Sequence, residues 1–165
     1  VATPGVFFYK EPQDMQDDRH DATMRCLAPR LVAGEWSSIF ETTARTQGEF
    51  RDGVFSYEAK GSDWSLEYVF SSDGLTLTAD CRKRGARLAF PIVAGRDNRV
   101  EVDGRTVRVI RPRGTVTFEA SVRPVVDHVD RVDRIWSPVS GLLCVPLSIP
   151  LSGSATVRVT VEERY

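Results

Sequence analysis

The chain has 165 residues, of which 41% are hydrophobic and 27% are charged, a composition that suits one folded domain and excludes general disorder. Its 22 basic and 23 acidic residues leave a formal net charge of −1, so no overall field would recruit a nucleic acid or an anionic membrane. No apolar run reaches the about 20 residues of a membrane-spanning helix, because Pro146 and Pro150 interrupt the longest run.

The N-terminal residues predict that the chain is a piece of a larger protein or has been processed. Residues 1–5 have the composition of a linker, and the first residue is Val1 rather than Met. Residues 6–9, which are Val, Phe, Phe and Tyr, predict a first strand because strands favour aromatic and β-branched side chains.

Residues 10–21 form an acidic segment with too few apolar residues to bury a face, so we expect a surface loop there. Calcium takes about six to eight oxygen ligands, and carboxylates are abundant in this segment. The candidate ligands are Asp14, Asp17, Asp18 and Asp21. Their spacing differs from that of the EF-hand loop and Arg19 adds a positive charge, so a solvated loop without metal is the simpler interpretation.

The next segment is ambiguous between helix and strand. Residues 22–27 fit either a short helix or a strand, and Pro29 limits any helix. The Thr, Ile, Phe and Trp content of residues 35–44 favours a strand, although Trp36, Phe40 and Ala44 could also line one side of a helix. We expect the Gln47-Gly48 and Asp52-Gly53 pairs to bracket a short connection into the central part of the chain.

Residues 53–111 alternate between apolar and polar side chains, with turn residues between the alternating runs. Residues 64–70 and 75–81 each place apolar side chains on one face, as a half-buried strand does. Around Asp103-Gly104 the pattern predicts a tight two-residue hairpin turn. This central part is therefore predicted to be a meander of antiparallel strands.

The alternation continues toward the C-terminus. Residues 115–122, 141–149 and 155–161 predict strands, and residues 125–136 fit a strand or an extended loop better than a helix because valine is a poor helix former. The whole chain is thus predicted to be all-β: a single domain over residues 1–165, folded as an antiparallel β-sandwich of about ten to twelve short strands with little helix.

One pair of residues is a candidate for catalysis. His128 lies in an Asp-His-Val-Asp segment, and Asp130 would share its side of a strand. A histidine held by a carboxylate can act as a general base. Alternating charges along an exposed face explain the same residues without chemistry, so catalysis by this chain alone stays uncertain and is the less favoured prediction.

Aromatic and arginine side chains are candidates for ligand binding. Trp64 shares a face with apolar residues and is predicted to be buried, whereas Trp36 and Trp136 have polar neighbours and are the better candidates for exposure. Packing in the core or at an interface is the simpler interpretation of these tryptophans. An exposed indole can stack on a sugar ring. Arg105 and Arg111 are an even number of residues apart, so they would share a strand face and could bind carboxylated sugars or a phosphate. Nearby acidic residues weaken the positive field, so an ordinary surface of ion pairs is the simpler interpretation; they are Asp97, Glu101 and Asp103.

The three cysteines, Cys26, Cys81 and Cys144, have no metal-binding or redox spacing. A disulfide with one spare thiol would fit an exported protein, extracellular or periplasmic, but the sequence leaves the compartment open.

The leading functional prediction is a carbohydrate-associated sandwich module, an accessory or non-catalytic domain of a polysaccharide-active enzyme. Its partner would be a carbohydrate or another protein domain. The alternatives are a structural or protein-binding sandwich domain, and a small enzyme that uses His128 with Asp130 or a metal at the acidic segment.

Overall fold

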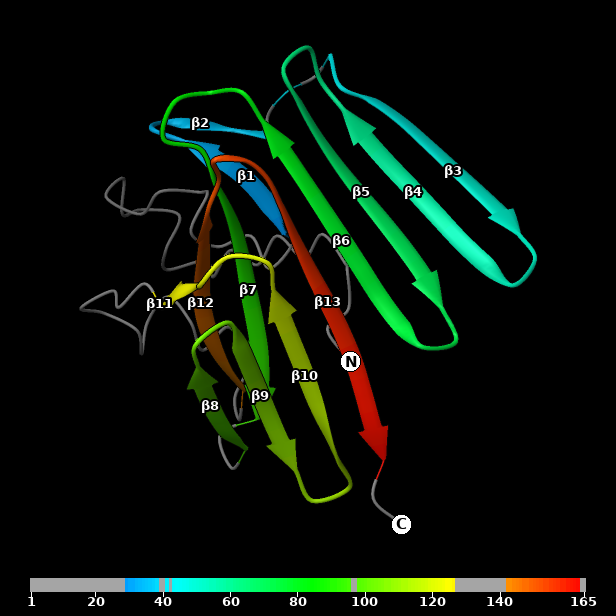
Figure 1. Ribbon diagram of the computed structural model, residues 1–165, viewed down its shortest axis with the longest axis vertical. Coiled ribbons are helices and arrows are strands. Elements are labelled where there is room, and N and C mark those ends of the chain that lie inside the picture. Colours follow the sequence, from blue (N-terminus) through cyan, green and yellow to red (C-terminus); the bar gives the residue numbers. More distant parts are fainter. Residues whose placement is uncertain (1–28, 39–40, 42, 96–97, 127–141, 164–165) are drawn as a thin grey trace, which may run out of the picture.

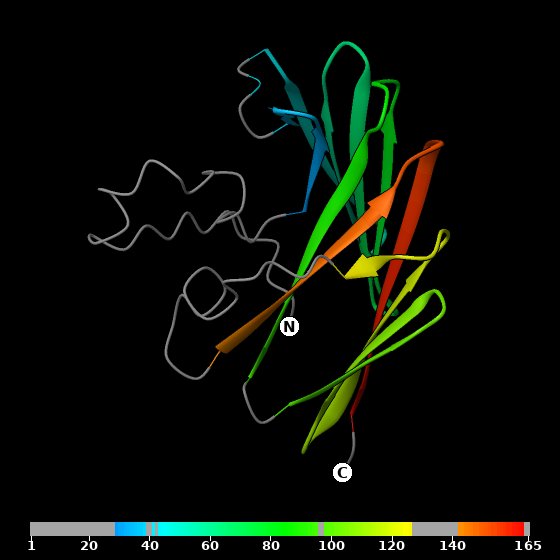
Figure 2. The same ribbon diagram turned by 90° about the vertical axis from the view of Figure 1, so that its left-hand side faces the viewer.

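The computed structural model describes residues 29–38, 41, 43–95, 98–126 and 142–163. Within these ranges the chain forms thirteen strands, all paired antiparallel, in two sheets. Figures 1 and 2 show the sheets as two layers. The prediction of an all-β antiparallel sandwich is confirmed. Among the described residues, no helix has the length and hydropathy needed to span a membrane.

The smaller sheet has five strands in the order β11–β12–β7–β1–β2. Their bounds are β1 (Arg30–Ala33), β2 (Trp36–Ser37), β7 (Arg87–Gly95), β11 (Val125–Val126) and β12 (Leu142–Pro150). Two of these strands, β2 and β11, have only two residues each, which is one reason why the count exceeds the ten to twelve expected.

The larger sheet has eight strands in the order β3–β4–β5–β6–β13–β10–β9–β8. Their bounds are β3 (Arg45–Arg51), β4 (Val54–Lys60), β5 (Trp64–Ser71), β6 (Gly74–Cys81), β8 (Arg99–Asp103), β9 (Thr106–Arg111), β10 (Gly114–Ala120) and β13 (Gly153–Glu163). Strand β13, the last in the sequence, lies between β6 and β10 and so joins two meanders into one sheet.

The core lies between the two layers and follows the alternation of the sequence. On β5 the side chains of Trp64, Leu66 and Tyr68 are buried, and the intervening Glu67 is exposed. The two layers meet where Phe90 of β7 and Phe118 of β10 pack edge to face, with ring centroids 5.8 Å apart.

Two hairpin turns differ from the sequence-based expectation. Asp52 and Gly53 both have positive φ, 51° and 80°, and they form the two-residue turn between β3 and β4. Gln47 and Gly48 lie within β3, so the expected short connection is wrong: a complete hairpin occupies that segment. Between β8 and β9 the paired residues are Asp103 and Thr106, which makes Gly104 and Arg105 the turn.

The strand expected over residues 35–44 is also shorter than predicted. Among the described residues of this stretch, Trp36–Ser37 alone forms a strand, and the next strand, β3, belongs to the other sheet. The carbonyl of Glu41 accepts a hydrogen bond from the Ala44 amide, which marks a turn rather than a strand.

Candidate functional site

Several predicted site residues lie outside the described part of the chain. These are His128, Asp130 and Trp136, the acidic residues Asp14, Asp17, Asp18 and Asp21, and also Cys26. Their roles stay predictions. In the described ranges there is no group of three or more His, Cys, Asp or Glu side chains placed to hold a metal ion. Cys81 is a free, buried thiol, and the loss of solvation raises its pKa.

Trp36 lies on the short strand β2 and is half-buried. Trp64, in contrast, is buried at the start of β5, as predicted. The two indoles pack edge to face, with centroids 6.1 Å apart. The ammonium group of Lys83 lies 4.8 Å from the centroid of the Trp36 ring, within range of a cation–π interaction.

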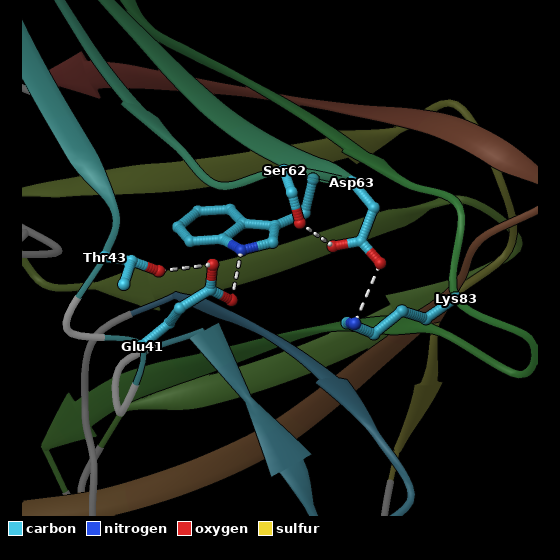
Figure 3. A network of polar contacts seen from close by, with 6 residues as sticks. Glu41, Thr43, Ser62, Asp63 and Lys83 are labelled. Carbon is cyan, nitrogen blue, oxygen red and sulfur yellow. Dashed lines mark hydrogen bonds and ion pairs between the residues drawn. The ribbon is translucent and has the colours of Figure 1, made fainter.

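Polar side chains form a network at this end of β5 and β6; Figure 3 shows Glu41, Thr43, Ser62, Asp63 and Lys83. The Trp64 Nε1–H donates to Oε2 of Glu41 at 2.8 Å, and the Thr43 hydroxyl donates to the other Glu41 oxygen at 3.4 Å. Lys83 Nζ lies 2.8 Å from Oδ2 of Asp63. We call Trp36, Glu41, Asp63, Trp64 and Lys83 the tryptophan–lysine cluster.

The ends of β5 and β6 bring this cluster together. Trp64 pairs with Cys81, so the residues just before β5 lie beside those just after β6. The Arg82 amide donates to the Asp63 carbonyl at 3.0 Å, which fixes the loop that carries Lys83. Gly61 leaves room for the indole, because a Cβ atom at this position would collide with Trp64 Nε1.

The ion pair keeps both of its groups charged near neutral pH. The hydrogen bond from Lys83 lowers the pKa of Asp63 below its usual value of 3.8. The hydrogen bond to Asp63 raises the pKa of Lys83 above 10.5. A carboxylate, an ammonium group and part of an indole ring therefore lie next to one another. This combination suits a sugar, whose C–H face stacks on an aromatic ring while its hydroxyls bond to charged groups.

The two predicted arginines do not form one site. Arg105 is in the turn before β9 and donates to the Ser121 carbonyl at 3.3 Å, whereas Arg111 is the last residue of β9. The length of the strand separates them by roughly 20 Å, at about 3.4 Å per residue. Ligand binding by either residue stays a prediction.

A second group of aromatic side chains extends from the buried Tyr68 to exposed rings at the edge of the larger sheet, and the sequence analysis did not predict that they share one face. On β3, β4 and β5 the rings of Phe50, Phe55, Tyr57, Tyr68 and Phe70 share one face of the sheet, and we call them the aromatic strip. Neighbouring rings contact one another: the centroids are 5.9 Å apart for Phe55 and Phe70 and 5.9 Å apart for Tyr57 and Tyr68. Phe50 is 73% exposed and Phe55 is 40% exposed.

The aromatic strip lies where β3, β4 and β5 extend sideways from the rest of the fold, at the right of Figure 1. Its signal in the sequence is the Asp52-Gly53 turn, because an I′ hairpin there places Phe50 directly opposite Phe55.

A family model described as the ulvan lyase C-terminal domain matches residues 1–164, almost the whole chain. The chain belongs to this family. No curated protein matches the chain significantly. The family associates this β-sandwich with polysaccharide lyases, so the prediction of a carbohydrate-associated domain from a polysaccharide-active enzyme is supported at that level.

Proposed function

We propose that this chain is a non-catalytic accessory domain of a polysaccharide lyase and that it contacts the polysaccharide through the tryptophan–lysine cluster. The observation that carries the proposal is the family match over residues 1–164. The family model describes a C-terminal domain of a lyase, and a match to such a domain supports an accessory role within that enzyme.

The cluster supports the second part of the proposal. Of the two tryptophans predicted to bind a ligand, Trp36 is the one that lies in the described part of the chain. Its ring lies beside the Asp63–Lys83 ion pair. The side chains of Lys83 and Asp63 are 31% and 32% exposed, so both groups can still reach a bound sugar. The buried Trp64 supports the Trp36 ring from the core side.

Binding of the isolated chain to ulvan, measured by isothermal titration calorimetry, tests the contact. Trp36→Ala should weaken binding about fivefold, since an aromatic contact contributes about 1 kcal/mol, and Trp36→Phe should retain most of the affinity. Val102→Ala, which shortens an exposed apolar side chain on β8, is the matched control. Circular dichroism establishes that each variant is folded. Absence of ulvan binding by the unaltered chain, or equal affinity for Trp36→Ala, would refute the contact.

The non-catalytic role is tested separately. A lyase creates a carbon–carbon double bond conjugated to a carboxylate, and this product absorbs ultraviolet light. We expect no increase in absorbance when the isolated chain is incubated with ulvan. A steady increase that His128→Ala abolishes would show that the chain is itself an enzyme.

A further inference from the structure

Strand β3 is an unprotected edge of the larger sheet. All seven of its residues, Arg45–Arg51, are exposed, and among the described strands it pairs with β4 alone. One side of its backbone therefore presents N–H and C=O groups that no described strand uses. Such an edge is a template for pairing with another strand.

The turn at Asp52-Gly53 determines which backbone groups point outward. Arg51 and Val54 flank this two-residue turn, so they form a hydrogen-bonded pair. Hydrogen-bonded and non-hydrogen-bonded pairs alternate along an antiparallel ladder. Arg51, Glu49, Gln47 and Arg45 consequently bond to β4. The residues between them, Thr46, Gly48 and Phe50, direct their N–H and C=O groups to the free edge.

Two charged side chains of β3 have no ion-pair partner among the described residues. Arg51 pairs with Asp52 at 3.5 Å, but among the described residues Arg45 and Glu49 have no ion-pair partner. Arg45 lies directly opposite Lys60 of β4, a like charge that disfavours the pair. The other edge of the sheet differs, because Arg99 and Glu101 of β8 already pair at 2.7 Å.

We propose that β3 pairs antiparallel with β3 of a second copy of this chain, centred on Gln47. In this register Thr46 bonds to Gly48 of the second copy, and each Arg45 faces Glu49 of the other copy. Opposite charges facing each other across strands stabilise a pair. Moving the centre to Gly48 would place Arg45 opposite Arg51, and moving it to Glu49 would place two glutamates opposite each other. Of these three registers, the one centred on Gln47 is the one that pairs opposite charges.

The same register also covers apolar surface. The Phe55 ring lies over Gly48, since a Cβ atom at Gly48 would come within 3.4 Å of that ring. Thr46 of the second copy would lie opposite Gly48 and therefore beside the Phe55 ring. The two aromatic strips would then continue across the joined sheets on one face, because opposed residues of an antiparallel pair point the same way.

A charge exchange tests the register. In sedimentation velocity, the unaltered chain should convert from monomer to dimer as its concentration rises. Glu49→Arg and Arg45→Glu should each weaken the dimer about tenfold by placing like charges opposite one another, and the double variant should restore it. Arg113→Glu, an exposed change in the β9–β10 turn, should have no effect.

Amide hydrogen exchange provides a second measurement. The N–H groups of Thr46 and Gly48 should exchange more slowly as the dimer forms, while those of Gln47 and Glu49, which bond to β4 in the monomer, should change little. A chain that stays monomeric at its highest soluble concentration would overturn the proposal. So would a dimer that neither single charge reversal weakens, or β3 amides that only ulvan protects.

Discussion

The hydrogen bond between Trp64 and Glu41 gives the sharpest prediction for stability. Trp64 is 4% exposed, so removal of the Glu41 carboxylate would leave the indole N–H of a buried residue without its acceptor. Its 2.8 Å bond is to a carboxylate, and hydrogen bonds to charged groups contribute about 1.5–3 kcal/mol. Glu41→Ala should therefore lower the free energy of unfolding by about 2 kcal/mol, whereas Glu41→Gln, which keeps an acceptor oxygen, should cost about 1 kcal/mol.

Urea unfolding followed by far-ultraviolet circular dichroism measures these values, provided that the slope with urea concentration is unchanged. The control is the same substitution in a Trp64→Phe background, where no indole N–H is left to satisfy. There Glu41→Ala should cost less than about 0.5 kcal/mol. An equal cost in both backgrounds would show that Glu41 stabilises the fold by another route and would refute the assignment.

Three further predictions follow from the same contacts. Gly61→Ala should destabilise the chain by about 1–3 kcal/mol, because its methyl group would displace the Trp64 indole from its acceptor; urea unfolding in the Glu41→Ala background should show a smaller loss. Phe90→Ala should cost about 3–5 kcal/mol by opening a cavity between the layers, and a loss below 1 kcal/mol would contradict the packing. The Asp63–Lys83 pair should stabilise the fold at neutral pH. The lowered pKa of Asp63 means that this contribution is lost as pH falls below 3.8 and through the folded-state pKa, and the raised pKa of Lys83 means that it is lost above pH 10.5. The difference in stability from Asp63→Asn should accordingly be constant near neutrality and shrink at both extremes; a difference that does not vary with pH would contradict the ion pair.

Side-chain alternation predicted the architecture because it acts locally. A strand that buries one face must carry apolar residues at every second position, and residues 64–70 do so without reference to the rest of the chain. The β3–β4 hairpin was harder to predict. Gln47-Gly48 and Asp52-Gly53 are both turn-forming pairs, and only the latter is used as a turn.

The candidate site depends on contacts that periodicity does not encode. Glu41 and Trp64 are 23 residues apart, and they meet because Glu41 lies in the connection that leads from β2 in one sheet to β3 in the other. The arginine prediction has a similar limit. Arg105 and Arg111 are an even number of residues apart, which is the spacing of residues on one face of a strand, but this spacing does not specify how far apart along the strand they lie.

The place of β13 has a consequence for how the domain forms. Without it, β3–β6 and β8–β10 would be separate meanders, because β6 and β10 meet only through this strand. The larger sheet therefore cannot be completed during synthesis until residues 153–163 have left the ribosome. Until then β6 and β10 each present an unpaired edge, and nascent chains are most exposed to aggregation in this interval.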